Sequence, residues 1–136
     1  MSKIVAVTGA TGFVGPHLVA ALARHGWTPR LLVRRLSPVP SFPGTTIELV
    51  LGDLEDEAAL SRLVDGADAV VHAAGLIKAR HTADFLRVNR DGTARLSAAS
   101  AGKLFLLLSS LAAREPRLSP ITISGERFSI PNQGRR

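Results

Sequence analysis

The sequence contains no cysteine, and this absence excludes several kinds of site at once. Without thiols the chain has no disulfide framework, no cysteine-ligated zinc and no cysteine nucleophile. The histidines are scattered and unpaired along the sequence, so we expect no metal site either. The lack of cysteine also fits a reducing compartment, and we expect the protein to be cytoplasmic.

Long hydrophobic runs are missing as well. The longest apolar run, at residues 104–108, has the length of a strand, whereas a membrane-spanning helix needs about 20 apolar residues. At the N-terminus, the apolar stretch between Lys3 and Thr8 is too short for the core of a secretory signal peptide. The sequence therefore predicts neither a membrane span nor a signal peptide.

Positive charge exceeds negative charge, and the formal net charge is +6. Half of that surplus lies in residues 114–136, which contain five arginines and two glutamates. The other arginines are scattered, and no basic stripe alternates with the aromatic side chains on which bases would stack. We therefore expect no nucleic-acid partner.

Short apolar runs alternate with helical patterns over the first hundred residues. The run at residues 4–7 is typical of a strand that is buried on both faces of a parallel sheet. Val14, Leu18 and Leu22 then recur at helical spacing, and Gly26 closes this helix. Further strands are predicted at residues 30–33, 47–51, 69–71 and 104–108, and further helices at residues 56–65 and 82–101.

This alternation predicts an α/β fold, a Rossmann doubly wound parallel sheet with helices on both faces. The expected strand order is 3-2-1-4-5, and the sequence predicts a sheet truncated after the fifth strand. Residues 1–113 are interpreted as one domain. Residues 114–136 show neither helical nor strand periodicity, and we expect an irregular, poorly ordered basic tail.

A glycine-rich turn follows the first predicted strand and opens the first predicted helix, the context in which such a turn binds a dinucleotide. In that context Gly9 permits the tight turn, Gly12 lets the backbone approach the pyrophosphate, and Gly15 allows close packing of helix on strand. The helix N-terminus then offers free N–H groups to the phosphates. The residues predicted to contact the phosphates are Gly9, Thr11, Gly12, Phe13, Val14 and Gly15.

The spacing of these glycines after Thr8 resembles that of the extended and atypical short-chain dehydrogenases/reductases, the NAD-dependent epimerase/dehydratase family. Four later segments resemble this family in the same order, and the resemblance extends from residue 3 to about residue 120. It implies an adenine-contacting turn, a segment lining the ribose and nicotinamide, a helix with a structural asparagine, and a catalytic serine. The residues implied are Asp53, Leu54, His72, Ala73, Ala74, Gly75, Asn89, Ser109 and Ser110.

The choice between NAD and NADP depends on the end of the second predicted strand. An acidic residue there would bind the ribose 2′-hydroxyl of NAD, but this sequence has Arg34 and Arg35 and no acid between Arg30 and Thr46. Guanidinium groups suit a 2′-phosphate through charge-assisted hydrogen bonds. We therefore predict NADP as the preferred cofactor, with NAD as the alternative. The other interpretation of Arg34 and Arg35 is that they are two solvent-exposed arginines on a loop.

The resemblance also implies a catalytic Tyr-x-x-x-Lys pair after the serine, and the chain contains no tyrosine. Ile121 and Gly125 stand where the tyrosine and lysine would be expected, and without the proton-transfer group that route of hydride transfer is blocked. The break at Ile121 suggests a truncated or frame-shifted product.

Two functions therefore stay open. One is oxidoreduction by hydride transfer on a nucleotide sugar or related alcohol or carbonyl compound, with Ser110 or Ser109 stabilising the substrate oxygen. The other is a non-catalytic nucleotide-binding fragment or a regulatory or assembly module. An incomplete sheet would also expose an unpaired edge strand, through which the chain could form oligomers.

Overall fold

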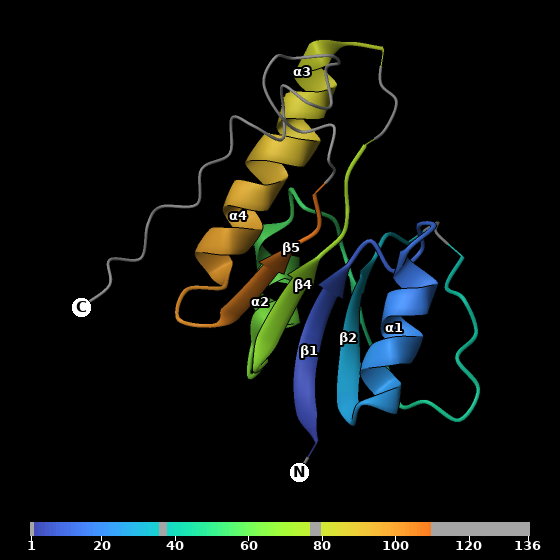
Figure 1. Ribbon diagram of the computed structural model, residues 1–136. Helices are drawn as coiled ribbons and strands as arrows, with labels where there is room; N and C mark the ends of the chain where they lie inside the picture. Colours follow the sequence, from blue (N-terminus) through green and yellow to red (C-terminus); the bar gives the residue numbers. More distant parts are fainter. Residues whose placement is uncertain (1, 36–37, 77–79, 110–136) are drawn as a thin grey trace.

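A computed structural model describes residues 2–35, 38–76 and 80–109, in which five parallel strands form one sheet between helices (Figure 1). The order of the strands is β3-β2-β1-β4-β5, which confirms the predicted Rossmann fold class and its topology. The strands are β1 (Lys3–Thr8), β2 (Trp27–Val33), β3 (Glu48–Leu51), β4 (Ala69–His72) and β5 (Leu104–Leu107). The helices are α1 (Gly15–Arg24), α2 (Glu57–Val64), α3 (Thr82–Phe85), the π-helix η1 (Leu86–Asp91) and α4 (Gly92–Ala99).

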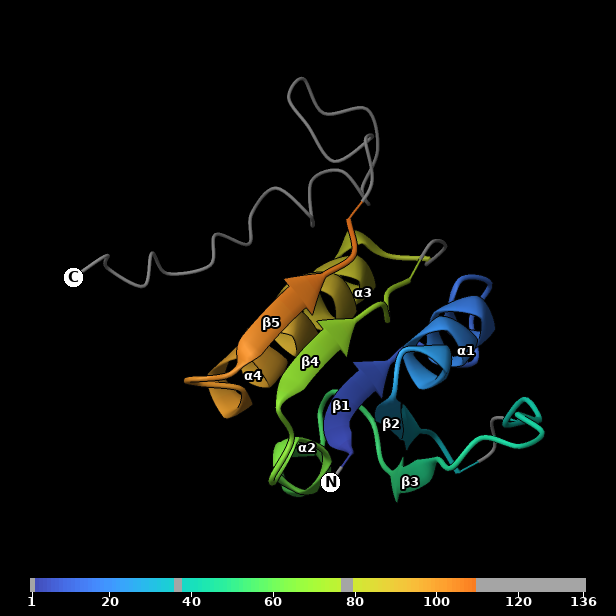
Figure 2. The same cartoon turned by 60° about the horizontal axis from the view of Figure 1, so that its bottom comes forward.

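The predicted tail at residues 114–136 lies outside the described residues, as does Ser110. Figure 2 shows the sheet from its lower end, with α1 on one face and α2 and α4 on the other. Both faces of the central strands are therefore covered, as the continuous apolar run at residues 4–7 predicts.

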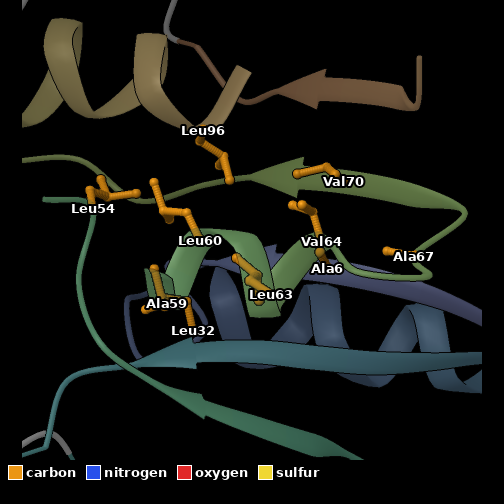
Figure 3. Packing of buried hydrophobic residues seen from close by; sticks show 10 residues of the cluster. All are labelled: Ala6, Leu32, Leu54, Ala59, Leu60, Leu63, Val64, Ala67, Val70 and Leu96. Atoms are coloured by element: carbon orange, nitrogen blue, oxygen red, sulfur yellow. The ribbon is translucent and has the colours of Figure 1, made fainter. Parts of the chain in front are cut away.

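Side chains of alternating residues along each strand enter two separate hydrophobic cores. Ala6, Leu32 and Val70 point towards α2 and α4, where they pack with Leu60 of α2 and Leu96 of α4 (Figure 3). All five are at most 9% exposed, so the core on this face is closed to solvent.

Within the described part of the chain, α1 is the helix that covers the opposite face. Val19 of α1 is fully buried against the core formed there by β1, β2 and β4. On the outer strands, the register places Leu49 opposite Leu31, and Leu104 opposite Ala69, so both leucines belong to the same face. They are 51% and 71% exposed, because α1 lies over the central strands.

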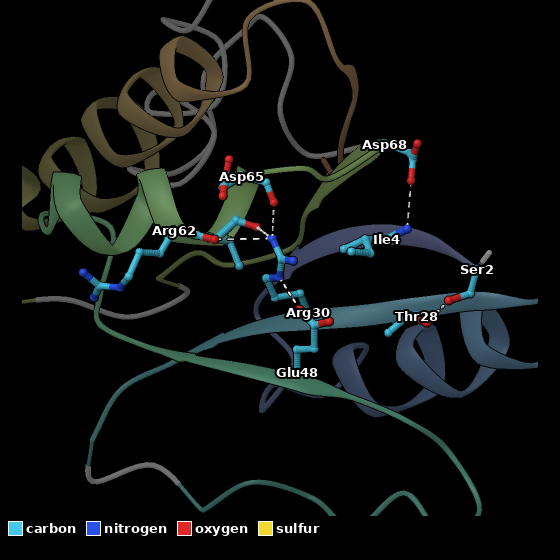
Figure 4. A network of polar contacts seen from close by, with 9 residues as sticks. Ser2, Ile4, Thr28, Arg30, Glu48, Arg62, Asp65 and Asp68 are labelled. Carbon is cyan, nitrogen blue, oxygen red and sulfur yellow. Dashed lines mark hydrogen bonds and ion pairs between the residues drawn. The ribbon is translucent and has the colours of Figure 1, made fainter.

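Helix α2 is held at both ends by polar contacts. At its start, the Asp56 carboxylate accepts a hydrogen bond from the backbone N–H of Ala59 at 2.9 Å and so caps the helix. At its end, the Arg30 guanidinium of β2 donates to the carbonyls of Leu63 at 3.2 Å and Asp65 at 2.5 Å (Figure 4). Arg30 also pairs with Glu48 of β3 at 2.5 Å, so it ties α2 to the edge of the sheet.

Two elements differ from the sequence prediction. Strand β2 begins at Trp27 rather than at Arg30, and it includes Pro29, which stands opposite Val5 in the register. The helix predicted at residues 82–101 is helical from Thr82 to Ala99, but its middle is the π-helix η1. A π-turn shifts each following residue around the helix axis, which changes the side chains that face the sheet.

Candidate functional site

A pocket of about 390 Å³ lies at the carboxyl ends of the parallel strands. This edge is where ligands bind in open α/β sheets, and the volume is in the range of small-molecule sites. Its walls come from the glycine-rich turn and from the residues that follow β2, β3 and β4. The lining residues are Thr8, Gly9, Thr11, Gly12, Leu32, Val33, Arg34, Gly52, Asp53, Leu54, Ala73, Ala74, Gly75, Leu76 and Val88.

The floor of the pocket depends on a close approach between two backbones. Gly9 has a φ of +78°, and a Cβ placed on it would lie 2.5 Å from the carbonyl carbon of Ala73. No other residue type fits there without moving the segment that follows β4. The turn after β1 and the segment after β4 are therefore packed directly against each other.

The other two glycines of the turn have different surroundings. A Cβ on Gly15 would lie 2.2 Å from the carbonyl oxygen of Gly9, which makes Gly15 a packing position between α1 and the turn. A Cβ on Gly12 would meet only that same oxygen, at 3.4 Å, and Gly12 lines the pocket. Gly12 therefore leaves space on the pocket side, where a ligand could approach the backbone.

Helix α1 begins immediately after this turn. Pro16 stands in its first turn, where a missing N–H costs nothing, and no acidic residue occupies that turn. The first N–H groups of a helix have no partner within the helix, and its dipole is positive at this end. The beginning of α1 can therefore attract an anion such as a phosphate.

The residues after β2 and β3 form the opposite wall. Arg34 lines the pocket and is exposed, while its neighbour Arg35 is exposed but is not among the lining residues. Asp53 also lines the pocket, and its Oδ1 atom accepts hydrogen bonds from the N–H groups of Glu55 and Asp56 at 2.8 and 3.1 Å. The Asp53 carboxylate therefore stabilises the turn that follows β3. Asp53 and Leu54 both line the pocket.

His72 is fully buried at the end of β4, behind the pocket rather than in its wall. Its Nδ1 atom is 2.5 Å from the hydroxyl of Thr8, and its Nε2 atom is 2.8 Å from the hydroxyl of Thr93. Burial lowers the pKa of His72 from 6.5 to about 4. The imidazole is therefore neutral at physiological pH.

Asn89 of η1 holds the segment that follows β4. Its Oδ1 atom accepts from the N–H of Leu76 at 2.7 Å, and its Nδ2 atom donates to the carbonyl of Leu76 at 3.1 Å. This pair of hydrogen bonds joins η1 to the segment that follows β4. Gly75 lies so close that a Cβ on it would be 3.1 Å from the Asn89 oxygen.

The structure brings most of the predicted site residues together, but not all. Ala73, Ala74 and Gly75 line the pocket with the residues described above. Phe13 and Val14 are 91% and 48% exposed and lie outside the pocket lining. The predicted residues that the structure describes outside the lining are Phe13, Val14, Gly15, Arg35, His72, Asn89 and Ser109.

Six lining residues were absent from the predicted site. Thr8 ends β1, directly before the glycine-rich turn, and its place could have been inferred from that turn. Leu32 and Val33 end β2, and the rule that ligands bind at carboxyl ends of strands is the signal that could have identified them. Gly52 directly precedes Asp53, so it could have been included with that turn. Leu76 and Val88 carry no comparable signal in the sequence, because their place depends on how η1 packs.

The described residues include neither a membrane-spanning helix nor a cluster of metal ligands. None of the helices in that part of the chain is both long and apolar enough to span a membrane. The same residues contain no group of three or more histidine, aspartate or glutamate side chains that could hold a metal ion.

Comparisons with known proteins identify a matching family and similar proteins. The model of the NAD dependent epimerase/dehydratase family matches residues 5–125. Among curated proteins, the ceramide reductase of Caulobacter vibrioides is 55% identical over 118 residues, which are 85% of this chain and 37% of the reductase.

Two similar solved structures come from Agrobacterium tumefaciens. A variant of uronate dehydrogenase, in complex with NAD, has a TM-score of 0.69 and 30% identity, covering 82% of this chain and 42% of that one. A short-chain dehydrogenase/reductase superfamily protein with bound NAD has a TM-score of 0.68 and 32% identity, covering 91% and 43%. This chain thus spans less than half the length of each of these relatives.

Proposed function

Because this chain belongs to the NAD-dependent epimerase/dehydratase family, we propose that its pocket binds a nicotinamide dinucleotide with the pyrophosphate on the turn at residues 8–15. One observation carries this proposal. Gly9 packs against the backbone of Ala73, and Gly12 leaves its backbone open to the pocket just before α1 begins. N–H groups and the positive end of a helix dipole would then face the phosphates.

The remaining walls suit the rest of a dinucleotide. Asp53 and Leu54 would contact the adenine, with the Asp53 carboxylate accepting from the exocyclic amine. The segment from Ala73 to Gly75 would line the ribose and nicotinamide, because small side chains leave room for the rings.

The preferred dinucleotide in this proposal is NADP. Arg34 lines the pocket at the end of β2, Arg35 follows it, and no acidic residue lies there to accept from a ribose 2′-hydroxyl. Both guanidinium groups carry solvent-accessible donors for a 2′-phosphate. Charge-assisted hydrogen bonds of this kind are the strong ones in protein recognition.

Titration of the purified chain with NADPH and NADH, followed by cofactor fluorescence, tests both parts of the proposal. We expect saturable binding of NADPH, and a loss of about tenfold or more in its affinity on replacing Arg34 and Arg35 by alanine. NADH affinity should change little. Arg24→Ala, which removes an exposed arginine at the end of α1, is the matched control. Equal losses for NADPH and NADH would contradict the preference for NADP, and no binding of either would contradict the proposed function.

For the whole protein we propose hydride transfer between the dinucleotide and a carbonyl or alcohol substrate. Ser109, two residues after the end of β5, or Ser110 would donate to the substrate oxygen. The identity of 55% with a ceramide reductase supports a ceramide-type ketone over a nucleotide sugar. Oxidation of NADPH in the presence of each compound, measured by absorbance, distinguishes the two substrate classes.

Binding without turnover is the second candidate function. One observation favours it: the 136 residues contain no tyrosine to transfer the proton that accompanies the hydride. A saturable titration together with no NADPH oxidation above the rate without protein would support this candidate.

A further inference from the structure

Three buried side chains form a continuous line of hydrogen bonds behind the pocket. Thr8 and His72 stand opposite each other on neighbouring strands, and Thr93 lies in the first turn of α4. Their exposed fractions are 0%, 0% and 3%. The line therefore joins β1, β4 and α4 without any contribution from solvent.

The direction of every hydrogen bond in this line follows from one contact. The Thr93 hydroxyl donates its single proton to the backbone carbonyl of Asn89 at 2.6 Å. Towards His72 it can then only accept, so the Nε2 atom of His72 carries a proton. In a neutral imidazole the Nδ1 atom is then an acceptor, and the Thr8 hydroxyl donates to it.

The far end of the line reaches the pocket wall. The oxygen of Thr8 still has a lone pair after donating to His72, and it accepts from the N–H of Ala74 at 3.2 Å. Ala74 lines the pocket, as does Thr8. The backbone of the Ala74 segment is thus held by this line on one side and by the amide of Asn89, through Leu76, on the other.

We propose that His72 is a positioning residue, held as the Nε2–H tautomer by Thr8 and Thr93, which fixes the pocket wall at Ala74 for the dinucleotide. The role in binding rests on the proposed function; the tautomer and the order of donors do not. Because each hydroxyl has one proton, the opposite tautomer would turn the Nδ1–H towards the Thr8 hydroxyl and take the Thr93 proton away from the carbonyl of Asn89.

The surroundings of the imidazole keep it neutral. Its two ring nitrogens contact the threonine hydroxyls, and the centroid of the Phe105 ring is 6.4 Å away; none of these three partners is charged. The lowered pKa agrees with this setting, because burial without a charged partner disfavours the imidazolium. One tautomer can therefore persist over the whole physiological range of pH.

The tautomer is tested first, in the full chain with labelled histidine. Nitrogen–proton NMR correlations through the imidazole distinguish the two neutral tautomers from the imidazolium. We expect His72 to give the pattern of the Nε2–H tautomer from pH 7 down to pH 5. The exposed histidines at positions 17, 25 and 81 serve as internal references. A proton on Nδ1, or an imidazolium pattern at pH 6, would overturn the proposal.

Variants of Thr93 then test whether the hydrogen bonds of His72 affect the pocket wall at Ala74 and the binding of the dinucleotide. Thr93→Val keeps the shape but removes the acceptor of the His72 proton, so we expect a mixture of tautomers and faster hydrogen exchange at the Ala74 N–H. NADPH affinity should fall by about tenfold, since a buried donor is left unpaired. Thr93→Ser keeps the hydroxyl and should restore the tautomer, the exchange rate and the affinity.

Ser100→Ala is the matched control. The Ser100 hydroxyl is also buried and also donates to a carbonyl four residues earlier, that of Leu96 at 2.6 Å, but it does not contact His72. Equal effects of Ser100→Ala and Thr93→Val on Ala74 exchange and NADPH affinity would overturn the positioning role. Failure of the unaltered chain to bind either dinucleotide would instead overturn the proposed function, while the tautomer spectrum would still decide the order of donors.

Discussion

Gly9, Gly12 and Gly15 belong to one turn, yet a side chain would have a different effect at each position. Gly9 and Gly15 lie against backbone atoms at distances that no Cβ tolerates, whereas Gly12 has open space beside it. Gly9 and Gly15 are therefore required by the packing of the turn, and Gly12 would be required by a ligand. Replacing Gly9 or Gly15 should therefore lower the stability of the chain, whereas replacing Gly12 should weaken the binding of the ligand.

We expect Gly15→Ala to lower the free energy of unfolding by about 1–3 kcal/mol, because the new Cβ would overlap the carbonyl of Gly9. Gly12→Ala should leave the stability nearly unchanged but weaken NADPH binding, since the methyl group would project towards the phosphates. Denaturant unfolding and dinucleotide titration measure the two effects. Gly12→Ala with unchanged affinity would place the pyrophosphate elsewhere.

His72 gives the stability of the chain a dependence on pH. Its pKa in the folded chain is about 4, below the ordinary value of 6.5, so between these values the unfolded chain binds more protons. The stability contributed by neutral His72 is therefore fully present above about pH 6.5 and is lost as the pH falls towards 4. The loss should be on the order of 3 kcal/mol.

Denaturant unfolding of the chain and of His72→Gln at several values between pH 7 and pH 4 measures this contribution. The free energy of unfolding should fall more steeply with acidification in the unaltered chain, because glutamine does not titrate. Parallel curves for the two proteins would show that the imidazole is not held neutral by the fold.

At the scale of single residues, the sequence predicted those lining residues whose position follows from a local pattern in the sequence. Gly9, Gly12, Arg34 and Asp53 line the pocket, and each follows a strand end, which has a known place in a parallel sheet. The burial of His72 behind the wall was not predictable, because it depends on Thr93, which lies 21 residues further along the chain. No local pattern connects these two residues.

Among the helices, α2 shows how a helix is fixed by residues outside it. Asp56 caps its first turn, and the buried side chains within it recur at the spacing of one helical face. The sequence predicted a helix at residues 56–65, within one residue of both ends of α2, because an aspartate before a helix and a glycine after it are local signals. The contact of Arg30 with the last carbonyls was not predicted, since it comes from a strand.

We expect Asp56→Ala to destabilise the chain by about 1 kcal/mol, the typical cost of losing an N-cap. Asp56→Asn keeps an acceptor for the N–H of Ala59 and should retain most of the stability. Thermal or denaturant unfolding of both variants measures the difference. Equal destabilisation by alanine and asparagine would mean that the charge of Asp56, rather than its hydrogen bond, supports the helix.

The segment from Thr82 to Ala99 shows what the spacing of apolar residues cannot predict. Its apolar residues predicted one continuous helix, and the π-helix η1 in the middle was missed. A π-turn inserts within a helix without a breaking residue such as proline, so the sequence of η1 continues the helical pattern. Its position coincides with Asn89, which is consistent with the frequent occurrence of π-turns at functional sites.

At the scale of the whole molecule, the two faces of the sheet are unequally covered. The face with α2 and α4 is closed, while the face with α1 exposes leucines on both outer strands of the described sheet. Leu104 and Leu106 of β5 are 71% and 55% exposed, and Leu49 and Leu51 of β3 are 51% and 53% exposed. Exposed apolar stripes beside an outer strand favour association.

We expect the purified chain to associate with itself as its concentration rises, through the exposed face of β5. Replacing Leu104 and Leu106 by lysine should shift the population to monomers, because an inserted charge opposes strand pairing and apolar contact. Sedimentation velocity measures the distribution. Ala98→Lys, on an exposed position of α4, adds charge without touching β5 and should leave association unchanged. Unchanged association in the leucine variant would exclude this face.

The order of the strands also determines when the sheet can close during synthesis. β1 is made first and occupies the centre, but its neighbour β4 ends only at residue 72. The 39 residues from 34, after the end of β2, to 72, at the end of β4, take roughly 2–8 s to synthesise at about 5–20 residues per second. For those seconds one side of β1 offers unpaired backbone groups and apolar side chains to anything nearby. In this interval the free edge of β1 is open either to a chaperone or to β4 as it is made. Whether the central strand pairs correctly depends on which of the two binds that edge first.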